Sequence, residues 1–159
     1  MNKLVKPLFL TFAAVIVSVS ASVVLAADPV IGTWQLNPTK TTPALAAVYK
    51  SQTRTYSQAG TGLALVIKTV LADGKESTTQ TTYQLDGKDY PVTGDPNYDS
   101  LSGKQIDASK AEFVLKRGGK QVGATDRTIS KDGKTLTAKT KITTVSGPTL
   151  EGNLIFDKQ

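Results

Sequence analysis

Four short segments of the chain have the composition of tight β-turns: Asp73-Gly74-Lys75, Asp86-Gly87-Lys88, Gly118-Gly119-Lys120 and Asp132-Gly133-Lys134. Each lies between runs rich in Thr, Val, Leu and Tyr, and such residues favour extended strands. Asp-Gly and Gly-Gly pairs tolerate a positive φ at both central positions, which a two-residue hairpin turn needs to match the twist of its strands. The spacing therefore predicts successive β-hairpins, that is, an antiparallel meander.

The residues between these turns alternate with the period of two that is typical of half-buried strands. In the stretch 135–145, for example, Leu136, Ala138 and Ile142 alternate with Thr137 and Lys139. About ten strands are expected, at positions 33–37, 52–58, 61–71, 76–85, 88–92, 99–107, 111–117, 120–130, 134–145 and 149–157. Thr42 followed by Pro43 also predicts a short helix near residues 43–49, because Thr is a good N-cap and Pro suits the first helical position. This helix is expected to plug one end of the sheet or to form a lid over a ligand entrance.

Ten sequential strands in a flat sheet leave unpaired backbone groups along two edges, and closure removes both edges. We therefore predict an all-β fold: an antiparallel up-and-down β-barrel of about 8–10 strands with the one short helix. A barrel of this size can enclose a small ligand. Its lining is expected to be partly polar, because hydroxyl side chains share one face of the strand at 76–85; that face carries Ser77, Thr79, Thr81, Tyr83 and Leu85.

The first 27 residues have the features of a signal peptide for export. Lys3 and Lys6 precede an uncharged, mostly apolar stretch from Leu8 to Leu25, and Val24-Leu25-Ala26 offers a cleavage site for signal peptidase. A retained membrane anchor is the alternative, since the stretch approaches the roughly 20 residues of a spanning helix. We expect cleavage near residue 27, a barrel domain of residues 28–159 in the periplasm or outside the cell, and no membrane span after cleavage.

The absence of Cys and His excludes much of enzyme chemistry. The chain can form no disulfide and has no thiol nucleophile or imidazole base. Most zinc, copper and haem sites also need Cys or His as ligands. The net charge is +6, and it falls by two, to +4, when Lys3 and Lys6 leave with residues 1–27. The remaining lysines are spread without a block, which indicates a solvated surface, with weak binding of anionic lipid or polysaccharide as the alternative. We expect no enzymatic activity, no cofactor, no metal and no nucleic-acid partner.

Two arginines in the middle of predicted strands are candidates for ligand binding. Arg54 shares a strand face with Tyr56, and Arg127 shares one with Ile129. An arginine that points inward can hold a carboxylate by two charge-assisted hydrogen bonds, with tyrosines beside it. The candidate ligand-binding residues are therefore Arg54, Tyr56, Tyr83 and Arg127. The alternative is that both arginines point outward, and the pattern leaves both orientations open.

Gly32-Thr33-Trp34, just ahead of the first strand, resembles the Gly-x-Trp signature of lipocalin-like (calycin-type) barrels, in which the tryptophan packs across the closed end. Three segments are also similar to small exported bacterial proteins with such a barrel and no established activity: 32–37, 86–94 and 130–136. The resemblance implies a barrel, export, structural roles for Gly32 and Trp34, and, more loosely, a small apolar or amphipathic ligand, as in lipocalins and fatty-acid-binding proteins. The chain departs from the lipocalin pattern where an arginine is expected over the tryptophan, because Asp157-Lys158 stands there.

Two functions follow. The first is an exported barrel that binds a small apolar or amphipathic molecule, as a carrier or sensor. The alternative is an envelope protein-interaction module, or an inhibitor, that acts through its outer surface and loops, with 93–99 and 38–51 as the contact segments. Its protein partner is unknown.

Overall fold

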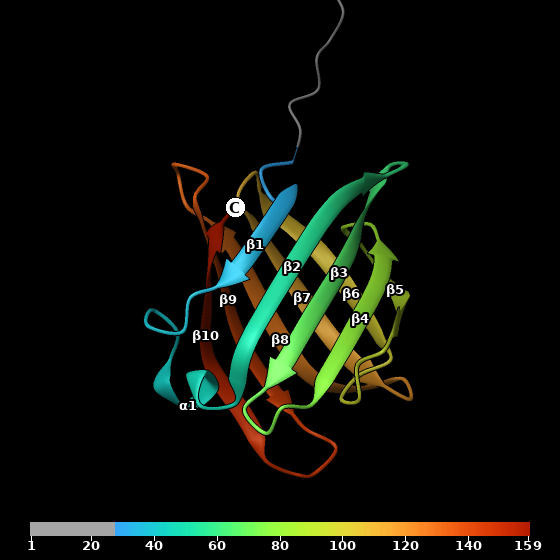
Figure 1. The fold of residues 1–159 in the computed structure, drawn as a ribbon. Coiled ribbons are helices and arrows are strands. Elements are labelled where there is room, and N and C mark those ends of the chain that lie inside the picture. Colours follow the sequence, from blue (N-terminus) through green and yellow to red (C-terminus); the bar gives the residue numbers. More distant parts are fainter. Residues whose placement is uncertain (1–27) are drawn as a thin grey trace, which may run out of the picture.

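The computed structural model describes residues 28–159, so the predicted signal peptide, residues 1–27, lies outside the described part of the chain. The elements are β1 (Gly32–Leu36), α1 (Pro43–Ala46), β2 (Tyr49–Ala59), β3 (Gly62–Leu71), β4 (Glu76–Tyr83), β5 (Asp86–Thr93), β6 (Ser100–Asp107), β7 (Lys110–Arg117), β8 (Lys120–Ile129), β9 (Thr135–Thr143) and β10 (Thr149–Lys158). Each strand pairs antiparallel with its neighbours in sequence, and β1 pairs with β10, which closes the barrel (Figure 1). The predicted up-and-down barrel with one short helix is confirmed. Within residues 28–159, no helix has the length and apolar character needed to cross a membrane.

The predicted positive φ at both central positions is found in one of the four turn segments and not in the other three. Gly118 and Gly119, between β7 and β8, have φ of 56° and 75°, so both central positions are positive as a two-residue hairpin requires. No non-glycine residue of 28–159 has a positive φ, so Asp73, Asp86 and Asp132 keep ordinary backbone conformations. Each of these aspartates instead accepts a hydrogen bond from the backbone N–H two residues further on.

The segment Asp86-Gly87-Lys88 lies between the last paired residues of β4 and β5, Thr81 and Val92, but it is not a separate two-residue turn between the strands. β5 already begins at Asp86, and the register between β5 and β6 shifts between Asp86 and Asp89. The connection from β4 is shorter, consisting of Gln84 and Leu85. A β-bulge and a hairpin turn both use a glycine with positive φ, so the dipeptide alone does not distinguish them.

The helix α1 is shorter than predicted because β2 begins at Tyr49, which pairs with Leu71 on β3. Pro43 occupies the first helical position as expected, but the Thr42 hydroxyl does not cap the helix. That hydroxyl accepts a hydrogen bond from the Asn153 backbone N–H instead, at 2.9 Å. Leu45 is fully buried in the core, so α1 packs against the barrel as a plug does.

Trp34, the middle residue of β1, is completely buried. Its indole Nε1 donates a hydrogen bond of 2.7 Å to the backbone carbonyl of Val30. The ammonium of Lys158 lies 5.0 Å from the centre of the indole ring. A lysine ammonium therefore lies over the tryptophan ring, at the place where the sequence has no arginine.

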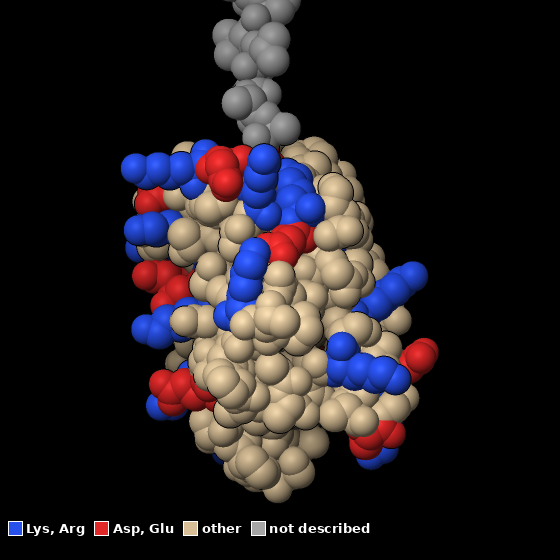
Figure 2. All heavy atoms as spheres, turned by 60° about the vertical axis from the view of Figure 1, so that its left-hand side comes forward, with Lys and Arg blue, Asp and Glu red and all other residues tan. Residues whose placement is uncertain are grey.

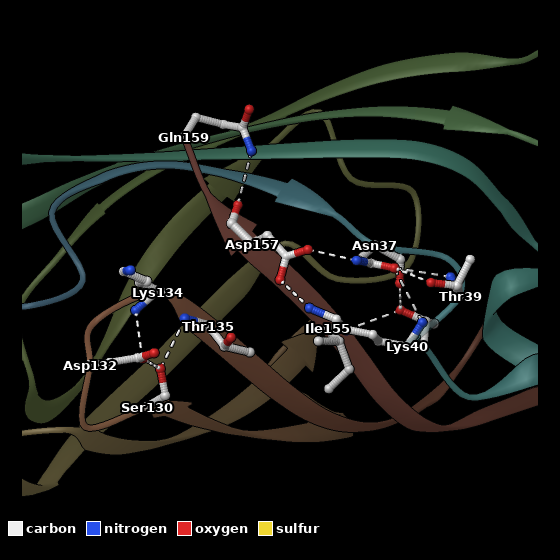
Figure 3. Close-up of polar contacts among 11 residues, drawn as sticks. Asn37, Thr39, Lys40, Ser130, Asp132, Lys134, Thr135, Ile155, Asp157 and Gln159 are labelled. Atoms are coloured by element: carbon white, nitrogen blue, oxygen red, sulfur yellow. Dashed lines mark hydrogen bonds and ion pairs between the residues drawn. The ribbon is translucent and has the colours of Figure 1, made fainter.

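The seam between β1 and β10 is short, and a polar network beside it extends the connection. The two strands pair at three positions only, Trp34 with Lys158, Gln35 with Asp157 and Leu36 with Phe156. Just after β1, the Asn37 amide donates to Asp157 at 2.6 Å, and the Lys40 ammonium lies 2.9 Å from the same carboxylate (Figure 3). These two donors, Asn37 first, lower the pKa of Asp157. The ionised carboxylate thus helps to hold the segment after β1 against β10.

Charges on the outer surface are mixed in sign. On the face in Figure 2, lysines and arginines are interspersed with aspartates and glutamates along the margins, and the central and lower part carries few charged side chains. Ion pairs such as Lys141–Glu151, at 2.8 Å, join neighbouring strands across this surface. This face therefore has no block of positive charge.

Candidate functional site: the barrel interior

The interior of the barrel contains a cavity of about 100 Å³. It extends from the end of the barrel at which β4 and β8 end, with Tyr83 and Arg127 (the inner end), to the end at which β2 begins and the loop 94–99 lies (the outer end). Both apolar and polar side chains form the wall. Its lining residues are Tyr49, Gln52, Arg54, Tyr56, Leu65, Ile67, Thr69, Tyr83, Asp95, Asn97, Tyr98, Leu101, Phe113, Leu115, Thr125, Arg127, Thr140, Ile142 and Leu154.

Arg127 points into the barrel because its strand register leaves room for it there. On β8, Arg127 alternates with the exposed Asp126 and lies opposite Ala111 of β7 and Ala138 of β9. Both alanines are buried, and their small side chains leave space on each side for a long guanidinium-bearing chain. Arg127 is only 3% exposed, so the alternative that it points outward is wrong.

The guanidinium of Arg127 lies among aromatic rings without an anionic partner. Nη1 donates a hydrogen bond of 3.1 Å to the Tyr83 hydroxyl, and the ring centres of Tyr56 and Phe113 each lie 5.5 Å from the guanidinium carbon. Nε is buried and has no hydrogen-bond partner among residues 28–159. Within the same range, none of the ion pairs involves Arg127. Among residues 28–159, this positive charge therefore has no carboxylate partner.

Tyr83 anchors the inner end of the cavity. The side chain is 1% exposed, and its ring packs edge-on against Phe113 with the centroids 5.6 Å apart. Burial, reinforced by the nearby Tyr56, raises the pKa of Tyr83, so the phenol stays protonated at physiological pH. Its oxygen accepts the Arg127 hydrogen bond, and its own proton remains free to be donated to a further acceptor.

Arg54 also faces the cavity, closer to β1. Its strand position pairs with Trp34 on β1 and Ile67 on β3, both of which are buried. The guanidinium lies 4.5 Å from the ring centre of Phe156, and Nε donates to the side-chain carbonyl of Gln52 at 3.0 Å. The outward alternative is therefore wrong for Arg54 as well. Unlike Arg127, Arg54 has a neutral acceptor for its Nε.

The loop 94–99 lies across the outer end of the cavity and is attached to the neighbouring β7–β8 hairpin and to the more distant β9–β10 hairpin. Arg117 donates to the Asn97 carbonyl at 3.0 Å, and the Val145 backbone N–H donates to the Asn97 side chain at 3.1 Å. The Gly118 N–H donates to the Asp99 carboxylate at 2.8 Å. These bonds join the loop to the turn between β7 and β8 and to the segment between β9 and β10.

Asp95 places one carboxylate at this outer end. The Asn97 N–H donates to it at 2.9 Å and the Thr79 hydroxyl at 3.3 Å, but burial outweighs these bonds and raises the pKa of Asp95. Burial also raises the pKa of Tyr49 and of Tyr98, and both tyrosines lie within electrostatic range of Asp95 and Arg54. One negative and one positive charge thus face the outer half of the cavity, whereas Arg127 is the charged residue among those that line the inner end. Asp28, which is not part of the lining, lies within electrostatic range of Tyr83 at that end.

The raised pKa of Asp95 predicts a specific pH dependence. An acid whose folded-state pKa is raised costs stability while it is ionised, and this cost disappears as the pH falls through the raised value. We expect the stability of the wild type relative to Asp95→Asn to fall as the pH rises from the acidic range to neutrality. Urea unfolding of both proteins, from about pH 4 to about pH 8, measures this difference. Asp126→Asn, which removes an exposed carboxylate, is the control for charge alone, and a pH-independent difference for Asp95→Asn contradicts the prediction.

The structure brings together all four candidate residues, Arg54, Tyr56, Tyr83 and Arg127, in the wall of one cavity. Sequence reasoning missed several other lining residues. Gln52 could have been predicted from the sequence, because it shares the strand face of Arg54 and Tyr56. Asp95 lies in a loop, where no alternation indicates the direction of a side chain.

The fold and the cavity together define a closed ten-stranded antiparallel barrel with a positively charged inner end. Among residues 28–159 there is no group of three or more acidic side chains placed to hold a metal ion. Comparison with known protein families, with curated proteins and with solved structures gives no match.

Proposed function

We propose that the protein, after loss of residues 1–27, is an exported lipocalin-like carrier or sensor that binds a small apolar or amphipathic molecule inside the barrel. The observation that supports this proposal best is the cavity wall, which combines aliphatic side chains with a buried guanidinium that has no anionic partner in the described part of the chain. A pocket with mostly apolar walls and a few convergent polar groups is the usual form of a small-molecule site.

Each part of the wall has a separate role in this proposal. Leu101, Leu115 and Ile142 offer apolar surface, and burial of a ligand against them contributes about 25 cal/mol for each Å² removed from water. Arg54, Tyr56, Tyr83 and Arg127 are the candidates for orienting a polar group. Such groups add specificity, because a ligand that leaves them unpaired loses affinity.

The proposal predicts that protein purified from its own host carries a bound small molecule. Native mass spectrometry detects it as a mass added to that of the folded chain, and the mass disappears after denaturation. Protein refolded without the molecule is the matched control, and its thermal unfolding midpoint is expected to lie below that of the purified form. If no added mass is found and no compound in a panel of fatty acids, isoprenoids and small organic acids raises the midpoint, the carrier function is refuted. A role through the outer surface and loops is then favoured.

A further inference from the structure

We propose that the ligand is a small organic carboxylate about as large as benzoate, bound with its carboxylate inward at Arg127 and Tyr83. This inference rests on the proposed function, since it names the chemical class of molecule that the cavity takes. It is carried by three features of the inner end of the cavity: its charge, its donor geometry and its volume.

The first feature is an uncompensated charge. Burial of a guanidinium is costly unless an anion or several hydrogen bonds replace the lost water. Arg127 has one hydrogen bond, to Tyr83, and favourable contact with two aromatic rings, but its Nε has no acceptor among the described residues. An anion that enters the cavity therefore supplies the partner that the protein itself does not.

The second feature is the type of anion that the donors suit. The planar guanidinium of Arg127 matches the two oxygens of a carboxylate, and the Tyr83 hydroxyl can donate its proton to one of them. Arg127 is the charged residue that lines the inner end, and Asp28, which is not part of the lining, lies within electrostatic range of Tyr83. One positive charge with a carboxylate nearby suits a monoanion better than a dianion. The Asp95 carboxylate at the outer end repels a second negative charge. A carboxylate is thus favoured over a phosphate dianion.

The third feature is size. The cavity measures about 100 Å³. An engineered apolar cavity of about 150 Å³ holds a benzene molecule, and drug-sized ligands occupy about 300–1,000 Å³. Because the cavity is smaller than the one that holds benzene, a molecule the size of benzoate is accommodated only with the edge of its ring extending out of this space toward the outer end, and the chain of a long fatty acid does not fit. The hydrogen bonds that hold the loop 94–99 over the outer end keep the space short.

The test is calorimetric titration of residues 28–159, freed of ligand by refolding. The four probes are benzoate, benzamide, palmitate and inorganic phosphate. We expect benzoate to bind at least tenfold more tightly than the uncharged benzamide, and palmitate and phosphate to bind weakly or not at all. The order follows because benzamide lacks the charge, palmitate lacks the space and phosphate lacks the apolar group.

Three variants assign the binding to the inner end. Arg127→Met is expected to abolish the preference for benzoate over benzamide, and Tyr83→Phe to weaken benzoate binding severalfold. Lys139→Met removes an exposed lysine of β9 and is the control for loss of one positive charge. Because apolar replacement of a buried unpaired charge is often neutral or stabilising, the midpoint of ligand-free Arg127→Met is expected to match or exceed the wild type. If this variant does not fold, Arg127→Lys serves instead, since it keeps the charge without the planar fork and is expected to weaken benzoate at least fivefold.

The outcomes separate this inference from the proposed function. Tight binding of palmitate but not benzoate overturns the inference and leaves a lipid carrier. Equal binding of benzoate and benzamide, or benzoate binding that survives Arg127→Met unchanged, also overturns it. Absence of binding by every probe overturns the inference, whereas the proposed function fails only if the host-purified protein also carries no molecule.

Discussion

Replacement of Trp34 by alanine is expected to lower the free energy of unfolding by about 3–5 kcal/mol, as is usual when a buried tryptophan is truncated. Trp34 has no exposed surface, and its removal leaves an empty volume against other fully buried side chains. It also removes the indole donor of the Val30 carbonyl and the ring under the Lys158 ammonium. Because Val30 and Lys158 lie beside the two ends of the described chain, the variant weakens the connection that closes the barrel.

Urea unfolding followed by circular dichroism measures this effect. Fluorescence is unsuitable, because Trp34 is the only tryptophan and the variant loses the signal. Val145→Ala is the control, since Val145 is 59% exposed and its truncation is expected to change stability by less than about 0.5 kcal/mol. Trp34→Phe keeps most of the volume and is expected to cost less than Trp34→Ala. A loss below about 1 kcal/mol for Trp34→Ala, within the range of ordinary substitutions, contradicts the structural role assigned to this residue.

Replacement of Gly94 by alanine is expected to lower the free energy of unfolding by about 3 kcal/mol or more. The loss has two causes, the positive φ at this position and a steric overlap of the new Cβ. Gly94 has φ of 80°, and a Cβ built there lies 1.9 Å from the backbone carbonyl oxygen of Thr78. A backbone oxygen cannot move aside as a flexible side chain can. The loop 94–99 must therefore shift away from β4, and with it Asp95 and Tyr98 at the outer end of the cavity.

Gly74→Ala is the matched control for this prediction. Gly74 has a similar φ of 84°, but a Cβ there meets no atom within 4 Å. Its cost is expected to be only the conformational one, about 1–2 kcal/mol. Hydrogen exchange adds a local measurement, because the Asp99 amide donates to Lys116 and the Gly118 amide to Asp99. Both amides should exchange faster in Gly94→Ala but not in Gly74→Ala, and equal effects of the two substitutions show that the overlap at Gly94 is relieved at little cost.

Much of the fold was predictable because each strand carries its own local signal. The alternation of Leu136, Ala138 and Ile142 with exposed residues in β9 places one face inward, and the structure buries these three. Turn chemistry was less reliable. Gly118-Gly119 forms the expected turn, whereas Asp86-Gly87-Lys88 is part of β5, where the register with β6 shifts. The sequence does not distinguish the two cases, because a bulge and a turn use the same glycine conformation.

The candidate site was only partly predictable. The residues on either side of each arginine are polar, threonines beside Arg54 and an aspartate and a threonine beside Arg127, so alternation of apolar and polar residues did not reveal which face is inward. The alanines of β7 and β9 that flank Arg127 come from different hairpins, and only their pairing shows that room exists beside it. Asp95 reaches the cavity through a loop whose path depends on Gly94 packing against β4.

The amino-acid sequence alone determined the class of fold, since period-two alternation and glycine turns are local features that few other architectures can satisfy. The tertiary structure decided that β1 pairs with β10, that Lys158 covers Trp34, and that Arg127 is buried with no anionic partner from residues 28–159. Each of these depends on residues far apart in the chain that meet only when the sheet closes. The size and charge of the cavity follow from that closure, because side chains from β2–β4, from β6–β10 and from the loop 94–99 line it together.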